Sequence, residues 1–451
     1  MKFKSLRVVA LTMAIGIAGI SPSALAQSSS VANSFSKQQS ELPLATHVQP
    51  VTVRNEKTVS TQNIPLSHLP AQHSLFAANM LATATDNTYG SNTSPDTALL
   101  IQSSTTPTAV SGYIDQQGGA RWYYTNISSA LKLTAFMTVS QANLDYDLKL
   151  YRYNETDSTL QLVSYSSYGA GHYELLSQVA TPGYYFISVT SYQGADTSNP
   201  FTLATVLSDS YDSSEPDDNP YFAKDRGAAF VSQQNIDNVL DEDWSKITLT
   251  KETTLNVRLN NPSANGDYVV YIKDANLQNL GSLKQNQLGQ ITLPAGSYYT
   301  QVYAPSKFDL TTPYTLSVGP AISRVAVSEI TSDRGVQGFI DYGQGKKWRV
   351  GYNIVVKGRA FDKTGNPVAS GIVSVKVQTR VGNSVFEQNG TTDSLGYFSI
   401  PLSIGAAAGQ YTYRGPVSTH YYDIIPITFS NMGIQLNADI NSLYHYAYSI
   451  R

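Results

Sequence analysis

Short runs of alternating apolar and polar residues fill the chain from about residue 86 onward, and turn-forming residues separate them. Examples are ARWYYTNI (120–127), LKLTAFMTV (131–139) and GYYFISVTSY (183–192), with Gly, Pro, Asn and Asp between such runs. Successive side chains on a strand point to opposite faces, so a period of two is typical of strands that bury one face. The pattern therefore predicts an all-β protein built from tandem sandwiches.

The order of these runs occurs twice. Residues 179–189 read VATPGYYFISV and residues 292–302 read TLPAGSYYTQV, so in both a Gly turn leads into a Tyr-Tyr pair. FTLATV (201–206) and YTLSVG (314–319) follow some 15 or 16 residues after that pair. Upstream, a Trp opens a strand in each copy. Two units, at 86–208 and 209–320, are the simplest account, and residues 321–451 form a third sandwich.

The first 26 residues are typical of an export signal. Three basic side chains stand within residues 1–7, residues 8–20 are mostly apolar, and small residues at 24–26 precede Gln27. This order predicts a secretory signal peptide cleaved after Ala26, and therefore a secreted protein. Residues 27–85 are rich in Ser, Gln, Ala and Thr with four prolines, which predicts a flexible spacer or propeptide. No later run predicts a membrane span.

Charge and cysteine usage exclude several classes of protein. The chain has no cysteine, so disulfides, a lipid-anchored cysteine and thiolate metal sites are ruled out. Its net charge of −3 is uneven: residues 86–208 carry −5, residues 209–320 carry −6 and residues 321–451 carry +4. This distribution argues against a nucleic-acid binder. It fits two units that accept cations, followed by one that could lie against an anionic surface.

Motifs in the two repeated units add a resemblance to a known family. The second unit contains Glu215-Pro216-Asp217-Asp218-Asn219, Asp241-Glu242-Asp243-Trp244, Gly296-Ser297-Tyr298-Tyr299 and Tyr314-Thr315-Leu316. The first contains Asp145-Tyr146-Asp147-Leu148, Glu174, Gly183-Tyr184-Tyr185 and Phe201-Thr202-Leu203. Together these resemble the bacterial pre-peptidase C-terminal domain, a small β-sandwich attached to many secreted bacterial enzymes. The first unit lacks the Glu-Pro opening and has Ala-Arg before Trp122; the second replaces the middle Asp-Leu run with GDYVVYIKD.

The last unit has a different pattern. GKKWRVGYNIVVKGRAFDKTGNPVASGIVSVKVQT followed by GTTDSLGYFSIPL resembles a bacterial immunoglobulin-like or carboxypeptidase-regulatory-type sandwich. Residues 362–367 (DKTGNP) and 392–396 (TDSLG) are predicted to form turns between strands.

Catalytic motifs are scarce. The six histidines form no HExxH, no G-x-S-x-G or phosphate-binding glycine loop occurs, and no thiol nucleophile exists. His420, close to Asp423, is the best candidate for a general base, although a structural histidine is the more common reading of such a residue. Residues 209–243 contain enough acids to supply a pair of glycosidase carboxylates, although they cluster in loop-like sequence. We therefore expect a protein that is not an enzyme.

Calcium is the best-supported cofactor. It takes six to eight oxygen ligands from carboxylates and carbonyls. Candidate ligands in the second unit are Asp212, Glu215, Asp217, Asp218, Asp241 and Asp243. The alternative is that these acids decorate an exposed interdomain linker. Asp145 and Asp147 share one face of a strand, about 7 Å apart. They are weaker candidates, and we expect them at a solvated strand entrance.

The sequence thus predicts a secreted, non-catalytic binding or accessory protein. Its partner would be an extracellular polymer, a cell surface or a secreted enzyme, with neither nucleic acid nor a membrane span involved. Exposed tyrosines, from a total of 31, would make the contacts. Two alternatives stay open: a structural surface or matrix protein, and a divergent secreted hydrolase that depends on His420.

Overall fold

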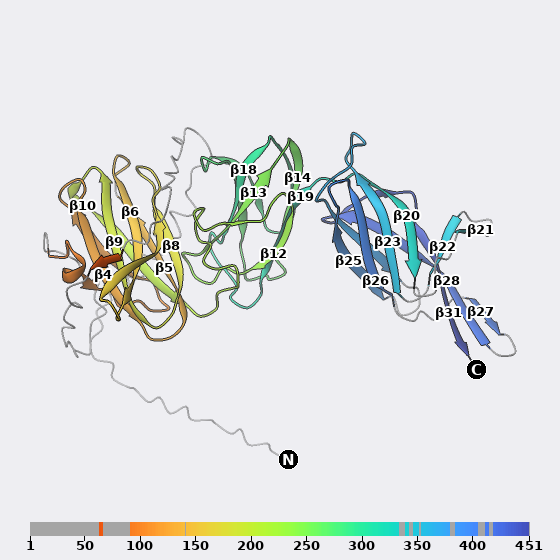
Figure 1. The fold of residues 1–451 in the computed structure, drawn as a ribbon, viewed down its shortest axis with the longest axis horizontal. Coiled ribbons are helices and arrows are strands. Elements are labelled where there is room, and N and C mark those ends of the chain that lie inside the picture. Colours follow the sequence, from red (N-terminus) through yellow and green to blue (C-terminus); the bar gives the residue numbers. More distant parts are fainter. Residues whose placement is uncertain are drawn as a thin grey trace, which may run out of the picture.

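The computed structural model describes residues 63–65, 91–139, 141–332, 339–341, 346–350, 353–378, 384–404, 411–414 and 418–450. Within these ranges the elements are strands, apart from a single 3-10 turn at Pro95–Thr97. Three sandwiches of two sheets each follow one another in a row (Figure 1). The predicted all-β fold class is confirmed. The predicted signal peptide and most of the predicted spacer lie outside the described residues.

The first sandwich packs a six-stranded sheet on a four-stranded one. Its strands are β1 (Asn63–Pro65), β2 (Leu99–Leu100), β3 (Thr108–Ile114), β4 (Ala120–Ile127), β5 (Leu131–Thr138), β6 (Asp145–Asn154), β7 (Thr159–Ser166), β8 (Glu174–Ala180), β9 (Gly183–Gln193) and β10 (Asp196–Ser208). The sheet orders are β1-β7-β6-β9-β4-β2 and β3-β10-β5-β8. β1 comes from the predicted spacer, which therefore contributes an edge strand through its antiparallel pairing with β7.

The second sandwich repeats this topology. Its strands are β11 (Lys224–Asp225), β12 (Phe230–Gln234), β13 (Glu242–Leu249), β14 (Thr253–Asn260), β15 (Val269–Lys273), β16 (Asn279–Lys284), β17 (Gln287–Leu293), β18 (Gly296–Tyr303) and β19 (Tyr314–Pro320). The sheet orders, β11-β13-β18-β15-β16 and β12-β19-β14-β17, match those of the first sandwich strand for strand once β1 is set aside.

Individual hydrogen bonds repeat as well. The hydroxyl of Tyr185 donates to the carbonyl of Thr181 at 3.1 Å, and that of Tyr298 donates to the carbonyl of Pro294 at 3.1 Å. Each tyrosine thereby fixes the Gly turn that precedes it. This contact gives a physical reason for the repeated Gly-Tyr-Tyr and Gly-Ser-Tyr-Tyr motifs.

The third sandwich has its own topology. Its strands are β20 (Arg324–Ser332), β21 (Phe339–Asp341), β22 (Lys346–Val350), β23 (Asn353–Phe361), β24 (Ile372–Gln378), β25 (Val385–Thr391), β26 (Tyr397–Ser403), β27 (Tyr411–Arg414), β28 (Ser418–Asn431), β29 (Ile434–Gln435), β30 (Asn437–Ala438) and β31 (Ser442–Ile450). One sheet has the order β26-β23-β20-β30; the other runs β21-β22-β31-β28-β24-β25, with β27 and β29 also pairing with β28. Asp362 N–H donates to the carbonyl of Asn366 at 2.9 Å, so the predicted turn at 362–367 is present.

Each sandwich encloses its own apolar core. Strand residues alternate between buried and more exposed positions, most regularly in β23 and β26. Tyrosine is a core residue here as much as a surface one: Tyr123, Tyr185, Tyr268 and Tyr314 are among the largest fully buried side chains. The abundance of tyrosine therefore reflects packing between sheets in part, and only some of these rings can contact a partner.

The second and third sandwiches meet through buried amides. The side-chain oxygen of Asn431 accepts from Asn256 Nδ2 at 2.5 Å and from the backbone N–H of Ile322 at 3.2 Å. Its Nδ2 donates to the carbonyl of Ile372 at 2.8 Å. Asn256 and Asn431 are 1% and 0% exposed. A single side chain on β28 thus joins β14 to two segments of the third sandwich.

Replacing Asn431 by alanine is expected to destabilise this junction. The change leaves the Asn256 amide and the Ile322 N–H without their acceptor, at about 1–3 kcal/mol for each buried unsatisfied group. Differential scanning calorimetry of the full chain should show a lower melting temperature for the third sandwich. Asn265→Ala, on an exposed loop, is the matched control. An unchanged melt would mean that the junction does not depend on this amide.

No helix within the described residues is long and apolar enough to cross a membrane.

Candidate cation site between the first two sandwiches

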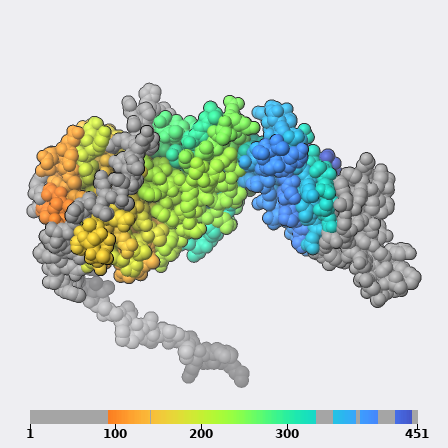
Figure 2. Space-filling view, viewed as in Figure 1, coloured from red at the N-terminus to blue at the C-terminus, as the bar shows by residue number. Residues whose placement is uncertain are grey.

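The start of the second unit lies against the four-stranded sheet of the first sandwich. Asn219 Nδ2 donates to the carbonyls of Tyr165 at 3.2 Å and Leu175 at 2.8 Å. Apolar side chains close the contact around Phe136, Leu175 and Leu240. Figure 2 shows the two sandwiches in continuous contact. We call the polar interior of this contact the carboxylate joint; it comprises Glu215, Asp217, Asp218, Asp237, Asp241 and Asp243, together with Lys132.

Lys132 stands at the centre of the carboxylate joint. It projects from β5 of the first sandwich, and its side chain is 0% exposed. Its ammonium nitrogen lies 2.5 Å from Glu215 Oε1 and 2.7 Å from Asp241 Oδ1. Oδ2 atoms of Asp218 and Asp237 are each 3.1 Å away. All four carboxylates belong to the second unit, so one ammonium holds that unit against the first.

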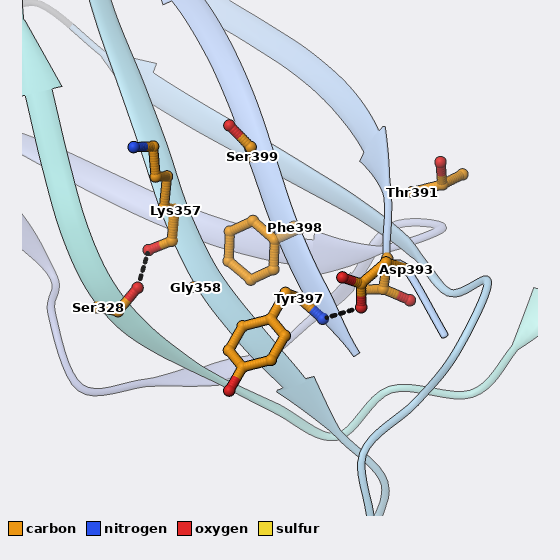
Figure 3. Close-up of a pocket in the computed structure, with 9 residues that line it drawn as sticks. Ser328, Lys357, Gly358, Thr391, Asp393, Tyr397, Phe398 and Ser399 are labelled. Atoms are coloured by element: carbon orange, nitrogen blue, oxygen red, sulfur yellow. Dashed lines mark hydrogen bonds between the residues drawn. The ribbon is translucent and has the colours of Figure 1, made fainter. Parts of the chain in front are cut away.

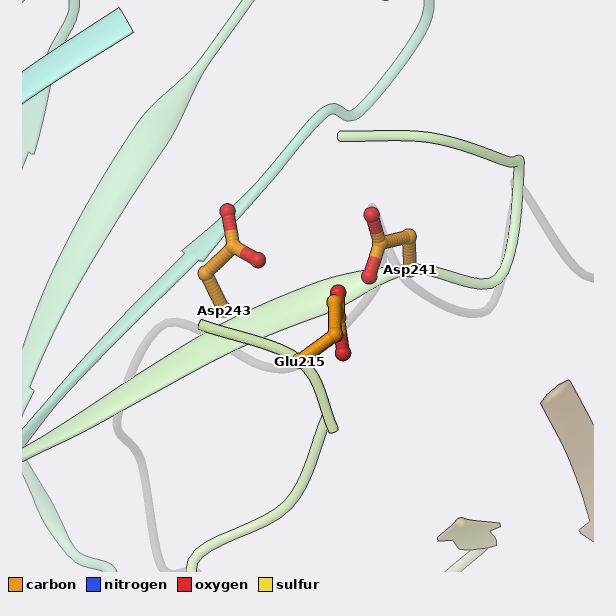
Figure 4. A group of neighbouring side chains, drawn as sticks. All are labelled: Glu215, Asp241 and Asp243. Carbon is orange, nitrogen blue, oxygen red and sulfur yellow. The ribbon is translucent and has the colours of Figure 1, made fainter. Parts of the chain in front are cut away.

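Three carboxylates of the joint converge beyond this ammonium. Oxygen atoms of Glu215, Asp241 and Asp243 all lie within 4.8 Å of one another (Figure 4). Asp241 and Asp243 leave the start of β13 on the same side, because they are two residues apart in an extended segment. Glu215 approaches from the preceding loop.

The other oxygens of these side chains are partly occupied. Tyr314 donates to Asp243 Oδ2 at 2.5 Å, the backbone N–H of Asp237 donates to Asp241 Oδ2 at 2.6 Å, and Gln234 Nε2 donates to Asp217 Oδ2 at 3.0 Å. Four buried oxygens of the joint accept no hydrogen bond from the described part of the chain: Oδ1 of Asp217, Asp218 and Asp243, and Oδ2 of Asp237. The last of these lies 3.1 Å from the Lys132 ammonium, so three oxygens are left without any partner. Buried carboxylate oxygens are normally satisfied, so these atoms call for a further partner.

Charge in the joint is strongly unbalanced. Six carboxylates whose side chains are almost wholly buried face one buried ammonium. Burial raises the pKa of Glu215 to about 8 and that of Asp217 to about 7, against the opposing pull of Lys132. Burial likewise raises the pKa values of Asp218, Asp241 and Asp243 well above their usual range. Without another cation, several of these groups must carry protons at neutral pH.

The pKa of Lys132 is governed by the charges around it. Burial tends to lower the pKa of Lys132, but the negative charges of Asp218, Asp241, Glu215 and Asp237 outweigh it and raise that pKa well above the usual lysine value. Lys132 therefore stays charged at every pH at which the protein would be handled.

Among the residues that the structure describes, the first sandwich has no such carboxylate set at the corresponding place. The backbone N–H of Trp122 donates to the carbonyl of Asn92 at 2.8 Å, just as the backbone N–H of Trp244 donates to the carbonyl of Asp217 at 2.9 Å. Asn92 thus corresponds to Asp217, and Arg121, which precedes Trp122, corresponds to Asp243. Arg121 is 1% exposed, and its guanidinium is permanently charged. At this place the second unit offers acids that could bind a cation, whereas the first unit carries a cation of its own, the Arg121 guanidinium.

Comparison with known proteins adds a family for part of the chain. The "Uncharacterized protein YlqB" of Bacillus subtilis (strain 168) is 46% identical over 128 residues, which are 28% of this chain and 80% of YlqB. The chain belongs to the YlqB family. The matched length is about that of one sandwich of this YlqB-family chain. Family models were compared as well, and none matches.

Solved structures resemble the YlqB-family chain only weakly. The CBM22-1–CBM22-2 tandem of Xyn10C from Paenibacillus barcinonensis is 12% identical, with 47% of this chain and 86% of that one covered, at a TM-score of 0.16. The PBSX exported protein XepA is 9% identical over 47% and 86%, at 0.19. The human CUB1-EGF-CUB2 fragment of MASP-1/3 is 11% identical over 48% and 99%, at 0.17. At these scores nothing about those proteins carries over to this one.

Five of the six acids that the sequence singled out in the second unit of the YlqB-family chain lie in the carboxylate joint. The exposed-linker interpretation of them is therefore wrong. Asp212 is the exception, because its two oxygens accept the backbone N–H groups of Ser214 and Asn235, at 2.6 and 2.9 Å. Sequence reasoning missed Lys132 and Asp237.

Asp145 and Asp147 differ from expectation in their environment. Each is 6% exposed, so the predicted solvated strand entrance is wrong. They lie at the start of β6, near the buried Glu174, whose pKa is raised by burial and further by the charges of Asp147 and Asp145. Neither aspartate belongs to the group of acids whose oxygens converge in the described residues.

His420 and Asp423 both lie on β28. The side chains of both residues lie outside those that the structure describes, so the hydrolase alternative stays a prediction.

Proposed function

We propose that this protein is an exported, non-catalytic binding protein whose first two sandwiches are held as one body by a calcium-loaded carboxylate joint. The observation that carries the proposal is the charge imbalance: six buried carboxylates against one ammonium, with three oxygens left without a partner. A divalent cation would remove both the excess charge and the missing partners in one step.

The donor set fits calcium. All ligands on offer are oxygens, which hard cations prefer, and they come from a loop and from the start of a strand, an irregular set that the variable geometry of calcium accepts. Glu215, Asp241 and Asp243 would hold the ion. Bound there, calcium supplies positive charge and no reaction chemistry. The residues of the chain bring the two sandwiches together around it, with Lys132 as the fixed cation beside it.

The same burial argues against catalysis at this site. A pair of glycosidase carboxylates must face a cleft that admits substrate and water. Here the acids lie between two sandwiches. The five aspartates are no more than a few per cent exposed, and the side chain of Glu215 is 0% exposed. A cation that joins domains is the use that this geometry supports.

Binding to an extracellular polymer is tested with the full mature chain, residues 27–451. We expect it to sediment with bacterial cell walls or insoluble polysaccharides in the presence of calcium, and to release no soluble sugar or peptide from them. Incubation without polymer is the control for self-association. Protein that stays in the supernatant with every polymer would contradict the proposal. Turnover that disappears in His420→Ala would establish the hydrolase instead.

A further inference from the structure

We propose that the outer face of the sheet β26-β23-β20-β30 binds an anionic polysaccharide through a row of alternating cations and aromatic rings: Arg324, Phe361, Arg359 and Tyr397. This inference rests on the proposed binding function and names the class of polymer and the site. The row crosses three neighbouring strands, because Arg324 is on β20, Phe361 and Arg359 are on β23, and Tyr397 is on β26.

The four side chains of the row are stacked on one another. The guanidinium carbon of Arg324 lies 3.9 Å from the ring centre of Phe361. That of Arg359 lies 5.6 Å from the same ring and 4.9 Å from the ring of Tyr397. Arg359 Nε also donates to the carbonyl of Leu395 at 2.8 Å, which fixes its orientation. The row is therefore organised before any ligand arrives, which reduces the entropy that binding must overcome.

This face is exposed and uncompensated in charge. Tyr397 is 47% exposed, and Leu395 beside it is 60% exposed. Among the described residues, neither Arg324 nor Arg359 forms an ion pair, although Lys357 on the same face pairs with Glu329 at 2.8 Å. The nearby turn acid Asp393 accepts the backbone N–H groups of Leu395 and Tyr397, each at 2.9 Å. Two guanidinium groups thus remain available to a carboxylate-bearing partner.

A shallow depression of about 600 Å³ adjoins the row (Figure 3). Tyr397 and Lys357 line it together with three hydroxyl-bearing residues, Ser328, Thr391 and Ser399. Such a lining matches a ligand that is itself rich in hydroxyl groups. An aromatic ring offers the C–H face of a sugar a flat surface of low conformational entropy, and the guanidinium groups select carboxylates on that sugar.

Other anionic polymers fit less well. Nucleic acids are bound through many phosphate contacts, and two unpaired cations are too few for this. An acidic peptide would use the charges but would leave the hydroxyl-lined depression and the exposed ring without a function. Charge, exposed rings and hydroxyls together favour a polysaccharide that carries uronic acids.

The test uses the full mature chain and soluble polygalacturonate, with fully methyl-esterified polygalacturonate and poly-γ-glutamate as comparison polymers. We expect polygalacturonate binding that weakens with salt, and a Kd that rises roughly tenfold or more in Tyr397→Ala and in Arg359→Gln. Tyr397→Phe, which keeps the ring, should bind nearly as well as the natural chain. Tyr192→Ala and Arg152→Gln, at exposed positions of the first sandwich, are matched controls, and thermal melts of all variants check folding.

The outcomes separate the two proposals. Equal binding of the esterified polymer or of poly-γ-glutamate would overturn the selection for a carboxylated sugar. Sedimentation with cell walls that persists in Tyr397→Ala and Arg359→Gln, without binding to polygalacturonate, would overturn this site and leave the binding function intact. A chain that binds no polymer in either experiment overturns both.

Discussion

Replacing Lys132 by methionine should lower the free energy of unfolding of the first two sandwiches by about 3–5 kcal/mol at pH 8 in the presence of a chelator. Methionine keeps the approximate shape but removes the charge that lies within 3.1 Å of four carboxylates. At pH 8 part of that carboxylate set is ionised, and buried charges without a partner are costly. Urea unfolding followed by tryptophan fluorescence measures the change, since the backbone N–H of Trp244 donates to the carbonyl of Asp217 in the joint at 2.9 Å.

The pH dependence distinguishes this effect from a simple loss of packing. At pH 5 the carboxylates with raised pKa values are largely protonated, so loss of the ammonium should cost less than at pH 8. The double variant Lys132→Met/Asp241→Asn should regain part of the stability, because it removes one of the uncompensated acids. Lys251→Met, on an exposed turn, should change little. Equal stability of Lys132→Met and the natural chain at pH 8 would show that proton uptake by the carboxylates replaces the lost ammonium charge.

The fold class followed from the sequence because it is a local property. The period of two in runs such as ARWYYTNI follows from strand geometry, and the repeated Gly-Tyr-Tyr motif follows from a hydrogen bond between residues four apart, Tyr185 to Thr181. Each of these two signals depends only on residues that are a few positions apart in the sequence. The resemblance of the first two units to pre-peptidase C-terminal domains stays a prediction, as do the domain boundaries.

Only part of the carboxylate joint could be predicted from the sequence, because the joint forms where the second unit docks on the first sandwich. Acids clustered in two short stretches of one unit could be recognised, and five of six converge. Lys132 could not, since its partners Glu215 and Asp241 lie 83 and 109 residues further along the chain. Taken without the rest of the chain, residues 131–134 (LKLT) of β5 predict a strand whose outer face is polar. That face is buried only because the second unit lies on it.

The same cause explains Asp145 and Asp147. Alternation along a strand tells which residues share a face, but it does not tell whether a second layer covers that face. A polar residue on a covered face looks like a solvated one in the sequence. One signal was available: Glu174, an acid directly before the apolar pair Leu175-Leu176, is 1% exposed and stands near both aspartates. Acids that coincide in several such runs indicate a buried polar site.

Calcium should reverse the pH dependence of stability. Glu215 and Asp217 titrate at about 8 and 7 in the folded chain, above ordinary values of 4.5 and 3.8. A carboxyl whose pKa is raised on folding stabilises the fold while protonated. In a chelator, the free energy of unfolding should therefore fall as pH rises from about 4 to 8, and then level off.

With calcium present, the ionised carboxylates become ligands instead of unpaired charges. The affinity for calcium should rise with pH over the same window, because binding displaces protons. At a calcium concentration of a hundred times Kd the free energy of unfolding should increase by about 2.7 kcal/mol. Thermal melts of residues 27–451 from pH 5 to 8, with calcium and with a chelator, measure both effects.

Matched variants locate the ion. Asp243→Asn should abolish the calcium-dependent shift, since Asp243 is one of the three converging acids and its Oδ1 lacks a partner. In chelator at pH 8 this variant should be at least as stable as the natural chain, because one buried charge is gone. Asp209→Asn, at an exposed position a few residues before the joint, should keep the full shift. A calcium-dependent shift that survives in Asp243→Asn would place the ion elsewhere. If no shift occurs at any pH while stability falls as pH rises, protons rather than calcium balance the joint.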